Sequence, residues 1–115
     1  MFNLRQRVDM VEAVFGGCDG VEVDTCEGLV SEYCKSRGIR YVLRGLRNSN
    51  ALEEIELANV YSDSNLDTVM FPITDSRYSL ISSTLVRECI KHNSDWRKYV
   101  PNKMHAVLEE NIMPF

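Results

Sequence analysis

The 115-residue sequence lacks the features that mark a metal centre, a disulfide scaffold or a membrane span. Its four cysteines include no C-x-x-C pair, and neither of its two histidines stands at metal-ligand spacing from another ligand. It has no run of about 18 apolar residues, and its first residues lack the basic and apolar regions of a signal peptide. We therefore expect reduced thiols, no metal-ligating side chains, no membrane contact and a cytoplasmic location.

Basic residues are also in deficit, with 13 against 17 acidic residues and a net charge of -4. A nucleic-acid partner needs a broad positive surface, so this balance argues against one. The segment 35–47 reverses the balance locally, because it contains five basic residues and no acid. Those residues are Lys35, Arg37, Arg40, Arg44 and Arg47. From charge alone, the segment is either a solvated basic edge or an anion site.

The end of this basic segment has the pattern of a strand that turns into a ligand loop. Tyr41-Val42-Leu43 is a short β-type run, and Arg44-Gly45-Leu46-Arg47 follows it. Gly45 lets the backbone approach a ligand closely, and two arginines suit bidentate contact with phosphate oxygens.

The most informative stretch is Tyr78-Ser79-Leu80-Ile81-Ser82-Ser83-Thr84-Leu85-Val86-Arg87-Glu88. Three hydroxyl residues end an apolar run, and a helical pattern then begins, with Arg87 on its outer side. Free N–H groups, the positive end of the helix dipole and Arg87 together suit a phosphate. The plainer alternative is a helix cap with no ligand, made by Ser83 or Thr84.

Helical and strand patterns alternate along the chain. We expect a helix capped by Asn3 and Gln6 and ended by Gly16, then a half-buried strand over 21–24. Further helices are expected over 28–37, 51–61 and 84–91 and after Pro101, and strands over 41–43 and 66–71. This order predicts an α/β fold with a parallel sheet that has helices on both faces. Ligands in such folds bind at the carboxyl ends of the strands, where both motifs fall.

Together, Arg-Gly-Leu-Arg after a strand and Tyr-Ser-x-Ile-Ser-Ser-Thr-x-Val-Arg-Glu resemble bacterial phosphopantetheine adenylyltransferase, of the nucleotidyltransferase superfamily. The resemblance extends over the whole chain, including Val21-Glu22-Val23 and the closing Asp95 to Pro101. It implies a partial Rossmann-like fold and a single domain over residues 1–115. It also implies the reaction of ATP with 4′-phosphopantetheine to give dephospho-coenzyme A and pyrophosphate, with Mg²⁺ as cofactor.

The resemblance also implies roles for individual residues. Arg44 would meet the phosphopantetheine phosphate, and Val30 with Leu29 would line the pantetheine arm. Glu54 is the best match for an acid that contacts ATP, although a one-residue gap leaves Glu53 as an alternative. The remaining ATP contacts would be Gly45, Leu46, Arg47, Tyr78, Ser79, Leu80, Ile81, Ser82, Ser83, Thr84 and Arg87.

One motif of the family has no counterpart in this sequence. The family opens with a strand, a Gly-Thr/Ser-Phe-Asp-Pro loop and a His-x-Gly-His-type signature, whereas here His92 and His105 lie outside any such pattern. We therefore expect the chain to correspond to the C-terminal portion of the family's domain, with no catalytic residue identified and with impaired turnover. The alternative is a non-catalytic nucleotide-binding or assembly module. The family forms hexamers, so we expect a homo-oligomer.

Overall fold

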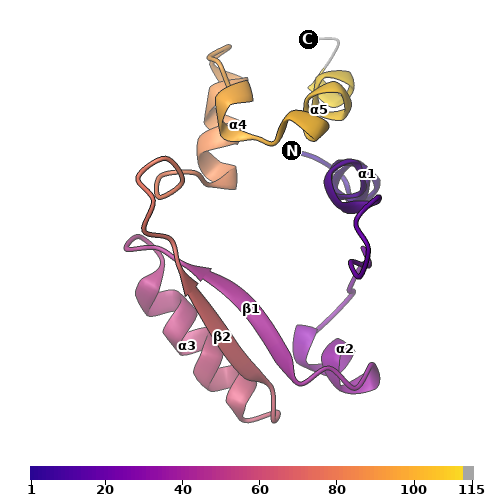
Figure 1. Cartoon of the computed structure of the whole chain (residues 1–115), viewed down its shortest axis with the longest axis vertical. Coiled ribbons are helices and arrows are strands. Elements are labelled where there is room, and N and C mark those ends of the chain that lie inside the picture. The colour runs from indigo at the N-terminus through magenta and orange to yellow at the C-terminus, as the bar shows by residue number, and fades with distance from the viewer. Residues whose placement is uncertain (113–115) are drawn as a thin grey trace. The chain divides into compact units, whose positions relative to one another are not determined.

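The computed structural model describes residues 1–112, and the chain divides into two compact units (Figure 1). One unit combines Met1–Thr25 with the chain from Ile81 onward, and the other is Cys26–Leu80. We call them the helical unit and the strand unit, and each is described by itself.

The strand unit is built on two parallel strands. β1 (Tyr41–Leu46) pairs with β2 (Asp67–Pro72), and the register runs from Tyr41 opposite Asp67 to Leu46 opposite Pro72. Parallel strands need a crossover connection, which here is the helix α3 (Ala51–Ser62). Helix α2 (Val30–Ser36) precedes β1.

The core of this unit lies between the sheet and its helices. Cys34, Tyr61 and Leu66 are buried there, and Tyr33, Val42 and Leu57 pack against them. Burial alternates along β1, as expected when one face of a strand is covered. The opposite face keeps four large side chains exposed: Tyr41, Leu43, Val69 and Phe71.

The helical unit contains α1 (Leu4–Phe15), α4 (Ser83–Lys91) and α5 (His105–Ile112). Two short 3₁₀ turns, η1 (Arg97–Tyr99) and η2 (Asn102–Met104), connect α4 to α5. Its core consists of Met10 of α1, Ile90 of α4, Trp96 just before η1, and Leu108 of α5. This core fixes α4, whose first turn carries the hydroxyl motif.

Several expectations from the sequence are confirmed. The chain is α/β with a parallel sheet flanked by helices, and Asn3 and Gln6 form the expected capping box with bonds of 2.8 and 2.9 Å. The observed helices and strands agree with the predicted ones to within a few residues, and β1 extends three residues further, to Leu46. The prediction of one domain over 1–115 stays a prediction.

The expected strand over residues 21–24 is wrong. Although Val21 and Val23 alternate with Glu22 and Asp24, the segment has no strand conformation, and Val21 is 48% exposed. A strand requires a hydrogen-bonded neighbour, and in the described residues β1 and β2 bond to each other alone. Alternation by itself could not supply that neighbour.

Residues 1–112 contain no helix that is both long enough and apolar enough to cross a membrane.

Candidate functional site

The first group of predicted site residues lies at the carboxyl end of β1. Arg44, Gly45 and Leu46 are the last residues of the strand, and Arg47 begins the connection to α3. The parallel sheet therefore brings this motif to the edge where α/β folds bind ligands, as the sequence predicted.

Arg44 is held by Glu54, one turn into α3. Its Nε and Nη2 donate to the two carboxylate oxygens of Glu54 at 2.8 and 2.9 Å. The side chain of Glu54 is 12% exposed and that of Arg44 is 42% exposed. A guanidinium has five N–H donors, so this fork leaves its outer edge available to an anion.

The pair has the electrostatics of a stable contact. The hydrogen bond from Arg44 lowers the pKa of Glu54, and the charges of Arg44 and Arg47 lower it further against the opposing effect of burial. The same hydrogen bond raises the pKa of Arg44. Glu54 is therefore ionised at neutral pH and hydrogen-bonded to Arg44. The alternative acid, Glu53, is exposed.

Sequence reasoning did not assign a role to Asn50, which is bonded to the same loop. Its Oδ1 accepts the backbone N–H of Arg47 at 2.7 Å, and its Nδ2 donates to the carbonyl of Gly45 at 3.3 Å. The available signal was an asparagine three residues after the motif, since asparagine side chains commonly bond to nearby backbone in turns.

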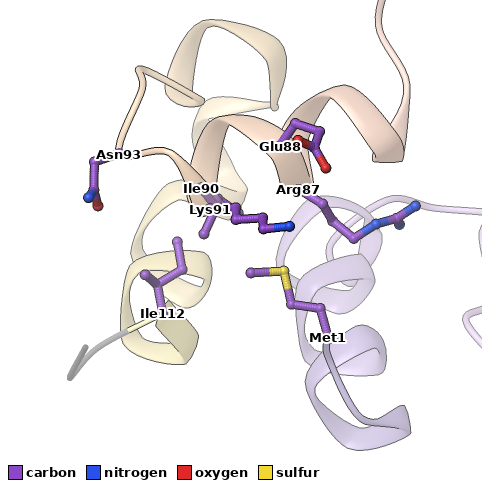
Figure 2. A pocket seen from close by; sticks show the side chains of 7 residues that line it. All are labelled: Met1, Arg87, Glu88, Ile90, Lys91, Asn93 and Ile112. Atoms are coloured by element: carbon purple, nitrogen blue, oxygen red, sulfur yellow. The ribbon is translucent and has the colours of Figure 1, made fainter.

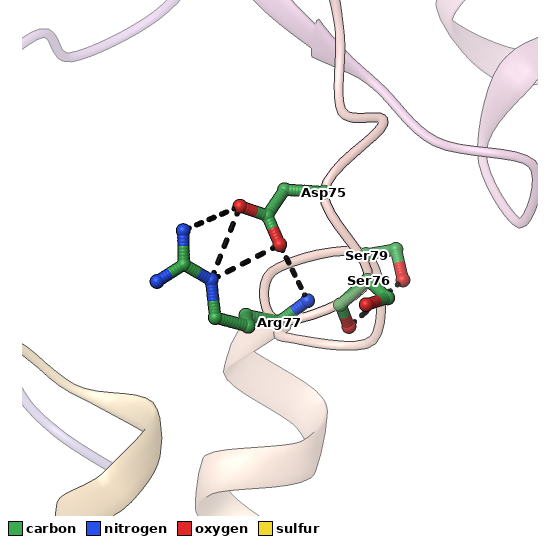
Figure 3. A network of polar contacts seen from close by, with 4 residues as sticks. All are labelled: Asp75, Ser76, Arg77 and Ser79. Atoms are coloured by element: carbon green, nitrogen blue, oxygen red, sulfur yellow. Dashed lines mark hydrogen bonds and ion pairs between the residues drawn. The ribbon is translucent and has the colours of Figure 1, made fainter.

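A second residue that sequence reasoning missed is Asp75, which organises the loop carrying Tyr78 and Ser79 (Figure 3). Its carboxylate pairs with the Arg77 guanidinium at 2.7 Å and accepts the Arg77 backbone N–H at 2.9 Å. Its carbonyl accepts the N–H groups of Tyr78 and Ser79, each at 3.0 Å. Arg77 lowers the pKa of Asp75 and lies 5.3 Å from the centre of the Tyr78 ring. Asp75 is therefore the centre of the hydrogen bonds in this loop, and the predicted ligand residue Leu80 that ends it is 78% exposed.

The second group begins α4 in the helical unit. Ser82 is in an extended conformation, and its Oγ accepts the N–H of Leu85 at 3.1 Å. The cap is thus Ser82. The alternative that named Ser83 or Thr84 as the cap is wrong in its residue, because the helix starts at Ser83, one residue earlier than the expected Thr84. The backbone N–H groups of Ser83 and Thr84 donate no hydrogen bond within residues 1–112, so two donors remain at the positive end of the helix.

Arg87 stands one turn beyond these donors. Its Nη2 donates to Thr84 Oγ1 at 3.3 Å, which holds the guanidinium on the side of the helix that carries the hydroxyls. Arg87 also lines a cavity of about 560 Å³ whose wall includes Ile90, Lys91 and Met1 (Figure 2). This first turn combines donors, hydroxyls and a cation, which is the chemistry expected of a phosphate site.

Leu29 and Val30 lie elsewhere in the strand unit. Leu29 lines a second cavity, of about 710 Å³, together with Arg40 and Leu66, the residues that precede β1 and β2. This cavity is at the amino ends of the strands, whereas Arg44 and Arg47 are at the carboxyl ends. The structure therefore does not bring Leu29 next to the Arg44 motif, and its contact with a pantetheine arm stays a prediction.

Both histidines have contacts outside these groups. His92 follows α4 at its far end and pairs with Glu88 at 3.3 Å. The His105 ring nitrogen Nε2 lies 3.0 Å from the carbonyl of Arg97, and the ring packs edge-on against Trp96. Neither imidazole belongs to the strand-end motif or to the first turn of α4.

Comparison with known proteins agrees with this arrangement. Residues 1–89 match the family described as cytidylyltransferase-like. Phosphopantetheine adenylyltransferase from two strains of Leptospira biflexa serovar Patoc is 36% identical over 111 residues, which is 94% of this chain and 69% of the relative. The enzyme of the same name from Solidesulfovibrio magneticus is 36% identical over 117 residues, or 99% of this chain and 67% of the relative. The chain therefore belongs to the cytidylyltransferase-like nucleotidyltransferases, a family of Rossmann-like enzymes, and within them to the phosphopantetheine adenylyltransferases.

Proposed function

We propose that this protein transfers the adenylyl group of ATP to 4′-phosphopantetheine in the cytoplasm. An oxygen of the 4′-phosphate attacks the α-phosphorus of ATP, the bond to the β-phosphate breaks, and dephospho-coenzyme A and pyrophosphate form. The observation that carries the proposal is the identity to phosphopantetheine adenylyltransferases over nearly the whole chain. The four free cysteines agree with a reducing compartment.

This chemistry asks the protein to position two polyanions and to offset their charge. In the strand unit, Arg44 offers the free edge of its guanidinium to the 4′-phosphate while Glu54 holds the other edge. Arg47 lies at the same strand end, for ATP. In the helical unit, the free N–H groups of Ser83 and Thr84 and the side chain of Arg87 suit the phosphates of ATP.

The remaining ATP contacts are proposed from the family resemblance. Both carboxylate oxygens of Glu54 already accept a hydrogen bond from Arg44. A contact of Glu54 with ATP therefore has to use a second lone pair on one of these oxygens. The other backbone and side-chain contacts belong to Gly45, Leu46, Tyr78, Ser79, Leu80, Ile81 and Ser82.

The described side chains do not form a binding site for the Mg²⁺ that we propose as cofactor. Residues 1–112 contain no group of three or more His, Cys, Asp or Glu side chains able to hold a metal ion, and Glu54 is engaged by Arg44. Magnesium often reaches such sites on the phosphates of the nucleotide, with water completing its coordination.

The proposal is tested by measuring ATP affinity in Arg87→Ala by calorimetry. Loss of one charge-assisted contact to phosphate should weaken binding by about 1.5–3 kcal/mol, or roughly tenfold to a hundredfold. The control is Lys103→Ala, which removes the same charge from an exposed lysine of η2 outside this cavity and should change affinity by less than about threefold. Equal affinity in wild type and Arg87→Ala would show that the first turn of α4 is not a phosphate site.

A specific observation favours a second candidate, ligand binding with little turnover. The family resemblance places a histidine motif at the reacting phosphates, whereas His92 lies beside Glu88 at the far end of α4 and His105 contacts backbone carbonyls. A pyrophosphate-release assay on the 115-residue polypeptide separates the candidates. ATP binding with release at about 1 s⁻¹ or faster supports the transferase, and ATP binding with release far below that rate supports the binding module.

We also propose that the protein self-associates, as the family resemblance implies. The open face of the sheet supports this proposal, because Tyr41, Leu43, Val69 and Phe71 are 51–69% exposed on it. Contiguous apolar surface of this kind commonly marks an interface. A single monomeric species by light scattering at high protein concentration would contradict it.

A further inference from the structure

Asn50 stands at the junction of the β1 loop with α3, but it does not cap the helix. Asparagine in this position usually accepts an N–H from the first helical turn. Here Asn50 has φ −123° and ψ 4°, and its side chain makes no capping bond. Both ends of its carboxamide are directed back to the preceding loop, to the N–H of Arg47 and the carbonyl of Gly45.

These contacts take up most of the backbone polar groups of residues 45–47. The Arg47 carbonyl accepts the backbone N–H of Asn50 at 3.1 Å, and the Leu46 carbonyl accepts the N–H of Ile73 at 2.9 Å. With the Arg47 N–H and the Gly45 carbonyl taken by the Asn50 side chain, the three carbonyls of residues 45–47 and the Arg47 N–H are all bonded within the protein. Along residues 45–47 a ligand therefore meets mainly side chains, among them that of Arg47.

Gly45 fits the same interpretation. A Cβ added at Gly45 would meet only the Ile73 side chain, at 3.7 Å, which is an ordinary contact. The glycine is therefore not needed for packing, and the loop is shaped by hydrogen bonds from Asn50. Bonds to the Arg47 N–H and to the Arg47 carbonyl fix the peptide groups on both sides of its Cα, and so the direction in which its side chain leaves the backbone.

We propose that Asn50 is the positioning residue for Arg47, just as Glu54 is for Arg44. Asn50 and Glu54 are four residues apart, so they lie on the same side of α3 and reach the two arginines from one helical turn. Asn50 does this with a neutral side chain, so it places no negative charge beside Arg47. The inference rests on the proposed function, since it takes ATP as the ligand.

The test is a double-mutant cycle on ATP affinity, measured by calorimetry in wild type, Asn50→Ala, Arg47→Ala and the double variant. If Asn50 acts through Arg47, Asn50→Ala weakens binding roughly five- to tenfold alone and less than twofold in the Arg47→Ala background. The matched control is Asn48→Ala, an exposed asparagine of the same loop with no side-chain bond in the described residues, and it should bind as wild type does.

A second measurement does not depend on the ligand. Amide exchange followed by NMR should show the Arg47 N–H exchanging about tenfold or more faster in Asn50→Ala, while Asn50→Asp, which keeps the acceptor oxygen, retains the protection. A wild type that fails to bind ATP overturns the proposed function and the positioning role together. If wild type binds ATP, three results would overturn the positioning role alone. The first is an unchanged ATP affinity in Asn50→Ala, and the second is an equal loss of affinity when Asn50→Ala is introduced into Arg47→Ala. The third is an unchanged exchange rate of the Arg47 N–H in Asn50→Ala.

Discussion

The Arg44–Glu54 pair should stabilise the strand unit measurably, in contrast to most surface ion pairs. The test is a double-mutant cycle with Arg44→Met, which keeps an apolar stem, and Glu54→Gln, which keeps the shape of the carboxylate. Exposed pairs usually couple by about 0.2–1 kcal/mol because water screens the charges. Here the fork is bidentate and the Glu54 side chain is 12% exposed, so screening is weaker on the acid side. We expect a coupling of about 1 kcal/mol, at the upper end of that range.

Urea denaturation at pH 7 gives the coupling, and the same cycle at lower pH checks its origin. The pKa of folded Glu54 lies below its ordinary value of 4.5, so the folded state binds the proton less readily than the unfolded state. The contribution is therefore fully present above about pH 4.5 and is lost as the pH falls through the depressed pKa. Arg44 keeps its charge throughout this range.

The more exposed pair of Arg77 with Asp75 provides a comparison, because its side chains are 75% and 40% exposed. Its coupling should be smaller and more sensitive to salt. A coupling for Arg44 and Glu54 below about 0.3 kcal/mol, or one that does not decline in acid, would refute the reasoning from burial and bidentate geometry.

Three further outcomes follow from the structure. Ser82→Ala should lower the free energy of unfolding by about 1 kcal/mol through loss of the α4 cap, and Ser83→Ala, whose side chain makes no capping bond, should have little effect in the same urea titration. Leu108→Ala should cost about 3 kcal/mol, because the side chain is 2% exposed, whereas Leu80→Ala at 78% exposure should change stability by about 0.5 kcal/mol or less. Gly45→Ala should fold with wild-type stability to within about 1 kcal/mol, since the added methyl group meets only the Ile73 side chain, and thermal melts check this.

The sequence predicted the elements whose signals are local. The capping box of α1, the α3 crossover and the two strands each depend on residues within one element, and each was found. The boundary of α4 was missed by one residue because three consecutive hydroxyl side chains can all cap, and only the backbone conformation of Ser82 decides among them.

What the sequence could not provide is pairing between elements. Residues 21–24 alternate as a strand does, yet a strand forms only where a neighbour supplies hydrogen bonds. The same limit applied to the site. Arg44, Arg47 and Glu54 were recognised, but the bonds from Arg44 to Glu54 and from Arg47 to Asn50 depend on where the chain places the start of α3. Asn50 and Asp75 were missed for that reason, since neutral or acidic side chains in loops are common and most have no such role.

The two faces of the sheet differ in how far other parts of the chain cover them, although the sequence predicted helices on both faces. The alternating order of helices and strands led to the expectation of helices on both faces of the sheet, and β1 carries apolar residues at both odd and even positions. Within the strand unit, α3 packs over the side of Val42, and Tyr41 and Leu43 on the other side stay 60% and 69% exposed. A strand that keeps large apolar side chains in water loses much of the stabilisation that burial provides, at about 25 cal/mol per Å². The large apolar residues on that face are therefore better explained if another surface packs against them. In the proposed self-association, a second copy of the chain provides that surface.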